Sequence, residues 1–301
     1  MRRLAAAIAA GAALTFPASA LAVPPCPGPA PSVATLLADQ GRLESVIVDR
    51  RGRVFFTNET QLLRLDKPGA TPRVLVDGVD GPGGLAFDAA GKLLMGSGNT
   101  LSNGAIGDLT GPAGLLRVDP ETGAHTVYAT GLSMANGVAR GPDGAVYATN
   151  DLGRNVDRVA GGQTQRGWSH VDSGNGAVVD SSGRWLYVAQ TFRPAAIARV
   201  DLAHPDQVTT YVAPTDPADL PAGLDGMARD AADDLFVAAN GAGEVWKVRS
   251  GSAPSICLLL DGLAPFPDGP SAVAVHGADV FVVTFGGDLI RITGVAATKS
   301  R

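Results

Sequence analysis

The sequence of 301 residues is poor in charged, aromatic and cysteine residues, and it lacks the motifs of several common enzyme classes. Only 18% of the residues are charged, and adjacent basic residues occur only at Arg2-Arg3 and Arg50-Arg51, so a nucleic-acid role has no support. There is no G-x-S-x-G nucleophile elbow, phosphate-binding loop or dinucleotide fingerprint. No stretch shows a sustained helical period, which excludes an α/β architecture.

Long apolar runs are also missing, except for one at the N-terminus that is too short to span a membrane. Two arginines precede the run "LAAAIAAGAALTF", which Pro17 ends, and the small residues "ASALA" follow. This order predicts a secretory signal peptide over residues 1–22, with cleavage after Ala20 or Ala22. We therefore expect a protein exported to the periplasm or beyond the cell, with no membrane span once the signal is removed.

Two cysteines, Cys26 and Cys257, lie near the two ends of the predicted mature chain. An even pair in an exported protein usually forms a disulfide, and two free thiols are the alternative. Neither cysteine has the C-x-x-C spacing or the histidine partner of a redox or metal site. We predict a Cys26–Cys257 bond that ties a Pro-rich lead-in, residues 23–31, to the far end of the chain.

Glycine and proline, in contrast, are abundant, with 39 and 21 copies, and they separate six similar segments. Each segment has a short apolar run, a polar turn and a second β-rich run, and the starts lie 39 to 53 residues apart. The segments are "ESVIVDRRGRVFFTN" from Glu44, "GGLAFDAAGKLLMGS" from Gly83, "NGVARGPDGAVYATN" from Asn136, "NGAVVDSSGRWLYVA" from Asn175, "DGMARDAADDLFVAA" from Asp225 and "PSAVAVHGADVFVVT" from Pro270.

A four-stranded unit that repeats every 40 to 50 residues is typical of a β-propeller blade. The sequence therefore predicts an all-β fold, a six-bladed β-propeller over residues 32–296 with a short tail at 297–301. Two packed β-sandwiches are the alternative, but they do not explain six similar units. We expect the segment Ser32 to Asp39 to add a strand to the last blade and so to close the ring.

The first residues of the six segments should meet at one end of the central channel. Four of them carry a side-chain oxygen: Glu44, Asn136, Asn175 and Asp225. Asn-Gly and Asp-Gly pairs are common in turns, but four such residues in register around one channel favour a shared cation. Two carboxylates and two amide oxygens suit Ca²⁺ best, with Mn²⁺ or Mg²⁺ possible. Zn²⁺ is less suited because the ring of six residues contains no His or Cys.

The second strand of each segment should return to the same end of the channel. Polar residues at or just after the ends of these strands are predicted to contact a substrate. They are Asn58, Asn150, Asp151, Gln190, Thr191 and Asn240. The longest insertion, "NTLSNGAIGDLTGPAG" from Asn99 to Gly114, leaves this rim and is expected to lie over it.

The segments "NGVARGPDGAVYATND", "NGAVVDSSGRWLYVAQT" and "DGMARDAADDLFVAAN" resemble the calcium-site motifs of the regucalcin/gluconolactonase family of six-bladed propellers. The resemblance extends over residues 35 to 295. It implies a metal-dependent hydrolase, commonly a lactonase, with a Glu–Asn–Asn–Asp metal set in which Asp225 is both ligand and base. The chain departs from the family pattern after Glu44, where Ser45 and Val46 replace Gly-Pro, and at Gly137, where the family often has Asp.

The leading hypothesis is an exported, metal-dependent hydrolase that opens a lactone or ester, with Asp225 or Glu44 as general base. The sequence leaves the oligomeric state open, with a monomer favoured. The competing hypothesis is a non-catalytic binding module, similar to NHL-type propellers, that holds a structural calcium ion. A condensing enzyme similar to strictosidine synthase is a third candidate.

Overall fold

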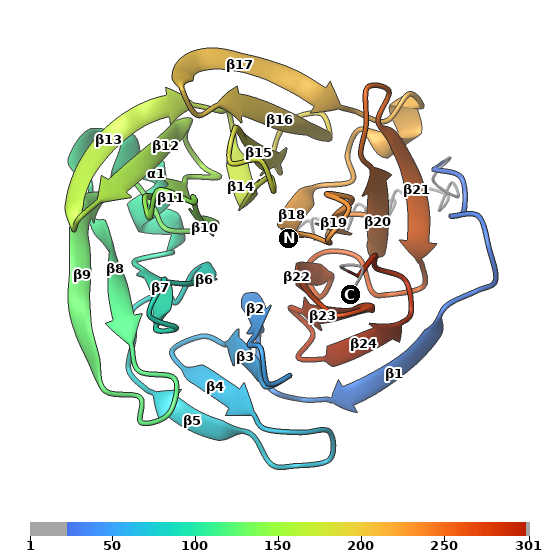
Figure 1. Cartoon of the computed structure of the whole chain (residues 1–301), viewed down its shortest axis with the longest axis horizontal. Coiled ribbons are helices and arrows are strands. Elements are labelled where there is room, and N and C mark those ends of the chain that lie inside the picture. Colours follow the sequence, from blue (N-terminus) through green and yellow to red (C-terminus); the bar gives the residue numbers. More distant parts are fainter. Residues whose placement is uncertain (1–22, 299–301) are drawn as a thin grey trace, which may run out of the picture.

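The computed structural model describes residues 23–298 and consists of six four-stranded antiparallel sheets arranged around a central channel (Figure 1). The predicted six-bladed β-propeller is therefore confirmed. In each blade the first strand lies beside the channel and the fourth lies on the outside of the ring. The six segments found in the sequence occupy the two inner strands of the six successive blades.

The blades follow one another along the chain. Blade 1 contains β2 (Ser45–Val48), β3 (Val54–Thr57), β4 (Leu62–Leu65) and β5 (Arg73–Val76). Blade 2 contains β6 (Leu85–Phe87), β7 (Leu93–Ser97), β8 (Ala113–Val118) and β9 (His125–Leu132). Blade 3 contains β10 (Val138–Arg140), β11 (Val146–Thr149), β12 (Asn155–Ala160) and β13 (Gln163–His170).

The second half of the ring repeats this order. Blade 4 contains β14 (Gly174–Val179), β15 (Trp185–Gln190), β16 (Ala196–Asp201) and β17 (His204–Val212). Blade 5 contains β18 (Leu224–Arg229), β19 (Leu235–Ala239), β20 (Glu244–Arg249) and β21 (Ser255–Leu260). Blade 6 contains β22 (Pro270–His276), β23 (Asp279–Thr284), β24 (Leu289–Thr293) and β1 (Ser32–Leu37).

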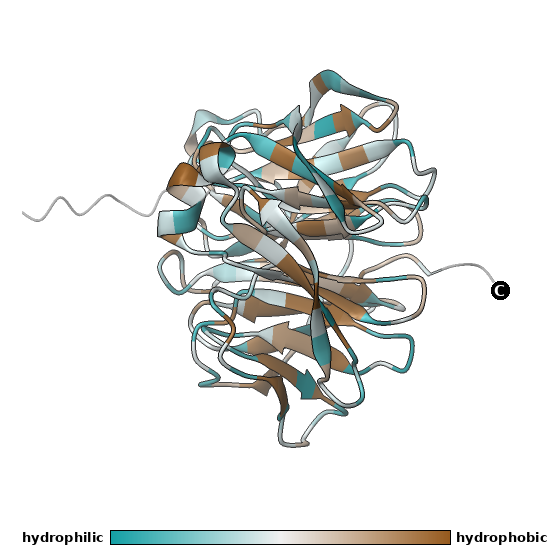
Figure 2. Ribbon diagram, turned by 90° about the vertical axis from the view of Figure 1, so that its left-hand side faces the viewer, coloured by the Kyte–Doolittle hydropathy of each residue, from teal (hydrophilic) through white to brown (hydrophobic). Residues whose placement is uncertain are grey.

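The hydrophobic core lies between neighbouring blades. Phe56 of blade 1, for example, belongs to one buried cluster with Phe281 and Leu289 of blade 6. Alternate residues of a strand point to opposite faces of its sheet, so each inner strand packs apolar side chains against the blades on both sides. Figure 2 shows this arrangement from the side, with hydrophobic residues concentrated in the strands within the ring.

Each blade turns from its first to its second strand at the same end of the channel. In blades 1 to 4 the turn contains a glycine with positive φ: Gly52 (80°), Gly91 (76°), Gly144 (85°) and Gly183 (72°). This conformation is one that residues other than glycine rarely adopt, which explains the regular glycine in the sequence. In blade 5 Asp233 takes the same conformation with φ 63°.

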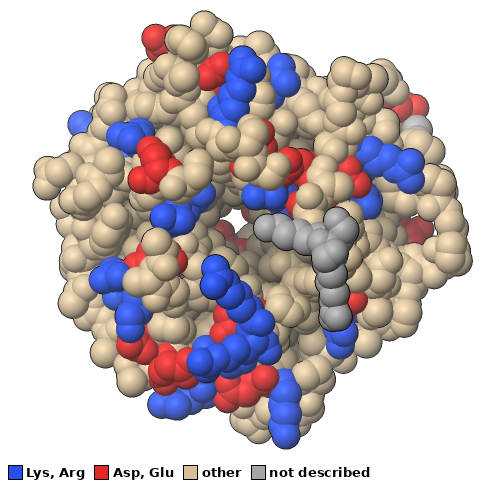
Figure 3. Space-filling view, in the orientation of Figure 1, with Lys and Arg blue, Asp and Glu red and all other residues tan. Residues whose placement is uncertain are grey.

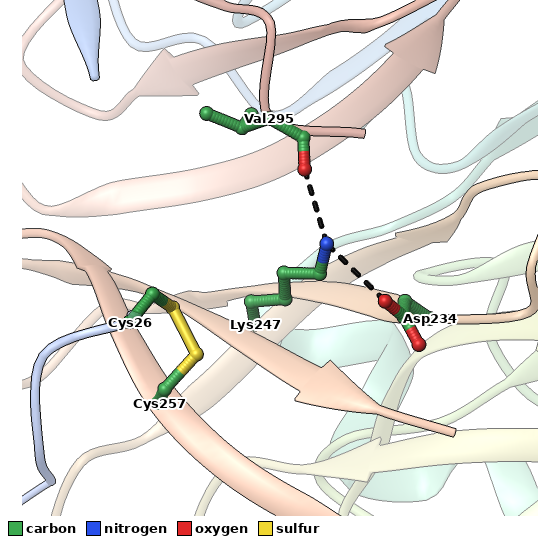
Figure 4. The surroundings of a disulfide bond; sticks show 5 residues. All are labelled: Cys26, Asp234, Lys247, Cys257 and Val295. Carbon is green, nitrogen blue, oxygen red and sulfur yellow. Dashed lines mark hydrogen bonds and ion pairs between the residues drawn. A yellow bond between two sulfur atoms is a disulfide. The ribbon is translucent and has the colours of Figure 1, made fainter. Parts of the chain in front are cut away.

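The N-terminal strand closes the ring, as predicted. Strand β1 pairs with β24 as the outer strand of blade 6, with Ser32 opposite Thr293. Before it, the lead-in is held to blade 5 by the predicted disulfide between Cys26 and Cys257, whose Cα atoms lie 4.8 Å apart (Figure 4). The bond spans 231 residues of sequence, and a loop of that length corresponds to about 5 kcal/mol of chain entropy in the unfolded state.

One α-helix, α1 (Leu101–Thr110), lies in the insertion between β7 and β8, where the sequence pattern gave no sign of a helix. Thr100 caps its N-terminus by accepting the N–H of Asn103, and Gly111 ends it in the left-handed conformation with φ 64°. A short 3₁₀ turn, η1 (Pro217–Asp219), precedes β18. The all-β prediction is therefore confirmed for the described residues, with this one short helix in the insertion.

The predicted signal peptide, residues 1–22, lies outside the described part of the chain, as do residues 299–301 of the predicted tail. Within residues 23–298, no helix has the length and hydrophobicity needed to cross a membrane.

Candidate functional site

The four predicted oxygen-bearing side chains converge at one end of the channel. Glu44, Asn136, Asn175 and Asp225 line one small cavity of about 60 Å³, each just before or within the first strand of its blade. Asn175 is 4% exposed and Asp225 6% exposed, while Glu44 is partly buried. Four blades thus contribute one side chain each to a shared, confined space.

The sixth blade departs from the predicted register by one residue. Ser271, rather than Pro270, lines the cavity. The Ser271 hydroxyl donates to the carbonyls of Leu43 and Val283, at 2.7 and 3.2 Å, and does not add a free oxygen to the site.

A glycine follows the channel-lining residue in blades 2 to 5, and close packing of the inner strands explains it. A side chain there would collide with the next blade, since two nonbonded heavy atoms rarely approach within 3 Å. An added Cβ would lie 2.4 Å from Val138 N at Gly84, 2.2 Å from Asn175 O at Gly137, 2.4 Å from Asp225 O at Gly176 and 2.6 Å from Ala272 Cα at Gly226. These glycines therefore let the first strands of neighbouring blades pack closely. The side chains of the residues before them can then lie close together in the channel.

Side chains near the ends of the second strands tie neighbouring blades together beside the site. Each donates a hydrogen bond to a main-chain carbonyl in the next blade. That carbonyl lies at or close to the start of the first strand of the next blade. The bonds are Thr149 to Asn175 (2.6 Å), Thr191 to Leu224 (2.6 Å) and Asn240 to Pro270 (3.1 Å). These bonds fix the spacing of the channel-lining residues.

A hydrogen bond orients the side chain of Asn175. Its amide donates to the Thr191 hydroxyl at 3.0 Å, and that hydroxyl donates to the carbonyl of Leu224 at 2.6 Å. A hydroxyl has a single hydrogen, so it accepts from Asn175, and the carbonyl oxygen of Asn175 is left for another partner.

Burial and neighbouring charges raise the pKa of the carboxylates at and beside the site. Burial raises the pKa of Glu44 to about 7, against the lowering effect of an Asn99 hydrogen bond. Burial, followed by the charges of Glu44 and Asp151, raises the pKa of Asp225 well above its usual value. Burial also raises the pKa of Asp151 to about 6. These carboxylates therefore resist ionisation unless a positive charge is bound beside them.

Two buried oxygens at the site have no hydrogen-bond partner. They are Oδ1 of Asp151 and Oδ1 of Asn99, whose amide nitrogen donates to Glu44 at 2.8 Å. Such atoms are rare in native proteins, and a bound water or ion is one of the arrangements that satisfies them. Asn99 was not among the predicted site residues, because it lies in the insertion rather than in a repeated segment.

These observations fit a hard divalent cation held by oxygen atoms. The candidate ligands are the carboxylates of Glu44 and Asp225 and the amide oxygens of Asn136 and Asn175. The two carboxylates, once ionised, attract a cation. Within residues 23–298 no three His, Cys, Asp or Glu side chains are placed so that they could hold a metal ion by themselves. The two asparagines are therefore indispensable to any cation site here.

The residues predicted to contact substrate lie around this end of the channel, but the protein uses many of their polar groups. Asn150 is fully buried and donates to Gly104 O and to Asp108, at 3.0 and 2.8 Å. The amide of Asn58 donates to Gln61 and to the carbonyl of Gln40, and Gln190 donates to the carbonyl of Asp172. Thr191 and Asn240 join blades, as described above. Their role in substrate binding remains a prediction.

No family model and no curated protein sequence matches the chain, whereas its fold resembles many solved structures. A gluconolactonase from Xanthomonas campestris superimposes with a TM-score of 0.69 at 17% identity, covering 90% of this chain and 97% of that one. A calcium-binding regucalcin from Agrobacterium tumefaciens gives 0.64 at 17% identity, covering 90% and 98%. Virginiamycin B lyase from Staphylococcus aureus gives 0.59 at 15% identity, covering 85% and 82%. At these identities the likeness establishes the propeller fold alone.

Proposed function

We propose that the protein is an exported, metal-dependent hydrolase that opens a lactone or ester, with Ca²⁺ as the cation that suits its site best. The observation that carries the proposal is the convergence of Glu44, Asn136, Asn175 and Asp225, where burial and then the charge of the neighbouring Asp151 raise the pKa of Glu44 and of Asp225. A scaffold alone has no need for opposed, buried carboxylates, which cost stability unless a cation or a proton compensates them. The gluconolactonase and regucalcin folds support the same assignment.

A cation bound by these four side chains would polarise the carbonyl of the substrate. Asp225 takes a proton from the attacking water as the water oxygen bonds to the carbonyl carbon. The ring carbon–oxygen bond then breaks, and the leaving oxygen receives that proton, so a lactone yields a hydroxy acid. Glu44 is the second candidate for the base, since it is confined in the same cavity.

The face that carries the site favours a substrate with an apolar part. Five large apolar side chains are strongly exposed there, although the described protein buries most others of their kind. They are Leu101, Ile106 and Leu109 on α1, Phe192 in the loop after β15, and Phe266 in the loop before β22. Exposed apolar groups beside a polar site are typical of ligand entry, so we expect lactones or esters with a hydrocarbon or aryl substituent to react best.

The proposal is tested with a panel of lactones and aryl esters, with the protein first treated with EDTA and then supplied with Ca²⁺, Mn²⁺, Mg²⁺ or Zn²⁺. We expect hydrolysis to disappear on chelation and to return with a hard divalent cation. Tight Ca²⁺ binding without hydrolysis of any panel member would support the binding-module alternative instead. Hydrolysis that is insensitive to EDTA would contradict the assigned chemistry.

A further inference from the structure

A second and larger cavity, of about 620 Å³, occupies the end of the channel where each first strand turns into the second. We call it the turn-end cavity. One apolar residue of each blade lines both this cavity and the small cavity that contains Glu44 and Asp225. These six residues are Val46, Leu85, Val138, Ala177, Met227 and Val273. The turn-end cavity is therefore separate from the candidate cation site, and its volume is typical of small-molecule sites.

The side chains that line the turn-end cavity are apolar except at its mouth. Among the described lining residues, polar side chains come from only four: Arg140, Arg229, Asp230 and Thr298. The first three lie at or just after the end of a first strand, and Thr298 lies in the C-terminal segment. An apolar wall offers water few partners, and cavities of this kind bind apolar ligands.

The two arginines at the mouth are the last residues of β10 and β18, and they differ in their partners. Arg229 is bound: its Nε donates to the carbonyl of Val179 at 2.8 Å, and its Nη1 pairs with Asp233 at 3.0 Å. Arg140 is half-buried, yet within residues 23–298 its guanidinium has no ion pair and no hydrogen bond. A partly desolvated guanidinium without an anion is a candidate for binding one from outside the chain.

The acidic residue at the mouth does not supply that anion. Oδ1 of Asp230 accepts the N–H groups of Ala232 and Asp234, at 2.9 and 3.0 Å, and Oδ2 accepts the N–H of Ala297 at 2.7 Å. The lining contains two guanidinium groups and one carboxylate, which leaves one net positive charge. Figure 3 shows the opening of the channel at this end, with basic side chains beside it. The mouth therefore favours an anionic group.

We propose that the turn-end cavity is a second ligand site, which binds a carboxylate with a hydrocarbon chain. The carboxylate lies at the mouth and accepts hydrogen bonds from the guanidinium of Arg140, whose fork of N–H groups matches two carboxylate oxygens. The chain extends into the channel toward the six apolar residues shared with the small cavity. This inference does not depend on the cation site or on the proposed hydrolysis.

The experiment measures binding by calorimetry, in EDTA, of hexanoate, octanoate, decanoate and the neutral alcohol 1-octanol. We expect one molecule to bind per chain, with an affinity that rises by up to about fourfold for each methylene that the cavity buries. The alcohol should bind at least about 10-fold more weakly than octanoate, because it lacks the charge that Arg140 recognises.

Two variants separate the mouth from the wall. Arg140→Gln should weaken octanoate binding by about 10-fold and leave 1-octanol binding unchanged, since only the charged contact is lost. Ala228→Phe, which places a ring in the half-buried wall, should abolish the binding of both ligands. Arg184→Gln is the matched control, because Arg184 lies after the turn of blade 4, outside the cavity, with its side chain 64% exposed. Its octanoate affinity should stay within about twofold of wild type.

Three results would overturn the proposal: no octanoate binding to wild type, equal effects of Arg140→Gln and Arg184→Gln, or binding that survives Ala228→Phe. The last result would place the ligand elsewhere, such as on the exposed apolar side chains of α1. If Ala228→Phe does not fold, Val178→Phe fills the same cavity from blade 4. Because EDTA is present throughout, failure of the cation site would leave every one of these results unchanged.

Discussion

Aspartate occurs at both ends of the channel, and the two ends use it in opposite ways. At the end with the strand turns, Asp49 and Asp180 each accept two backbone N–H groups of their own turn through Oδ1. Asp88 does the same, and although burial opposes it, hydrogen bonds from Lys92 and Arg117 keep its pKa below the usual value. At the site end, burial raises the pKa of Asp225 instead.

The surfaces of the two ends also differ in polarity. The turn end is rich in paired charges, such as Arg53 with Asp49 and Glu121, and Figure 3 shows basic and acidic residues side by side around the channel opening. The site end carries α1 with its exposed apolar side chains, seen as the coiled ribbon at the left of Figure 2. At the turn end, carboxylates that are paired with cations or N–H groups stabilise the turns. At the site end, buried carboxylates with raised pKa values are candidates for proton transfer or cation binding.

The largest effect is expected from Asp225→Asn, which keeps an oxygen for the cation but cannot accept a proton. Hydrolysis should fall by about 10² or more, the range of general-base loss, even at saturating cation. Asp180→Asn is the control from the turn end, and its rate should match wild type. The measurement is initial rate against cation concentration for both variants. If saturating cation restores Asp225→Asn to the wild-type rate, Asp225 is a ligand only.

The same comparison shows which features could be predicted from the sequence. The turn end follows from local chemistry, because Asp and Gly at fixed spacing specify a tight turn wherever they occur. The six-bladed fold could be predicted because the segment of two strands and a turn occurs six times. The four channel-lining residues could be predicted because each stands at the start of its segment. The disulfide was predictable from two cysteines in a chain with a predicted export signal.

The parts that could not be predicted depend on contacts between distant segments. Asn99 reaches Glu44 across a blade boundary, and no local pattern indicates it. Helix α1 was missed because its buried face consists of Gly104 and Gly107, while its apolar residues are exposed, the reverse of an ordinary amphipathic helix. Such a local conflict between sequence and structure is expected at a functional site.

A smaller effect is expected when the two amide ligands are removed. Asn136→Ala and Asn175→Ala should weaken Ca²⁺ binding by about 10- to 100-fold, with activity partly recovered at high cation concentration. Both residues are buried, so thermal unfolding without cation serves as the check that each variant folds. An unchanged affinity in both variants would place the cation elsewhere.

The opposed carboxylates should make the cation-free protein less stable as pH rises. The folded-state pKa values of Glu44, about 7, and Asp151, about 6, lie above those of the unfolded chain, so the folded state binds more protons. This contribution is complete below about pH 4 and is lost as pH rises through 6 to 7. In EDTA the melting temperature should fall by roughly 5 °C over this interval, and Ca²⁺ should reverse the fall.

Asp225→Asn provides the control for that titration, because it removes one of the opposed charges. Its melting temperature in EDTA should depend less on pH between 5 and 8 than that of wild type. A wild-type melting temperature that rises over this range without cation would mean that the site carboxylates are not opposed.

The smallest effect is expected at the turn end, from Asp180→Ala. The change removes the acceptor for the N–H groups of Arg184 and Trp185, each bonded at 2.9 Å, and a hydrogen bond contributes about 1 kcal/mol. Because the turn is solvated, water replaces part of the loss, and the melting temperature should fall by only about 2 to 4 °C. Ca²⁺ affinity should stay at the wild-type value, since the turn and Asn175 lie at opposite ends of β14. A fall in affinity as large as that of Asn175→Ala would show that the two ends of the strand are coupled, and the division between a structural end and a chemical end would then fail.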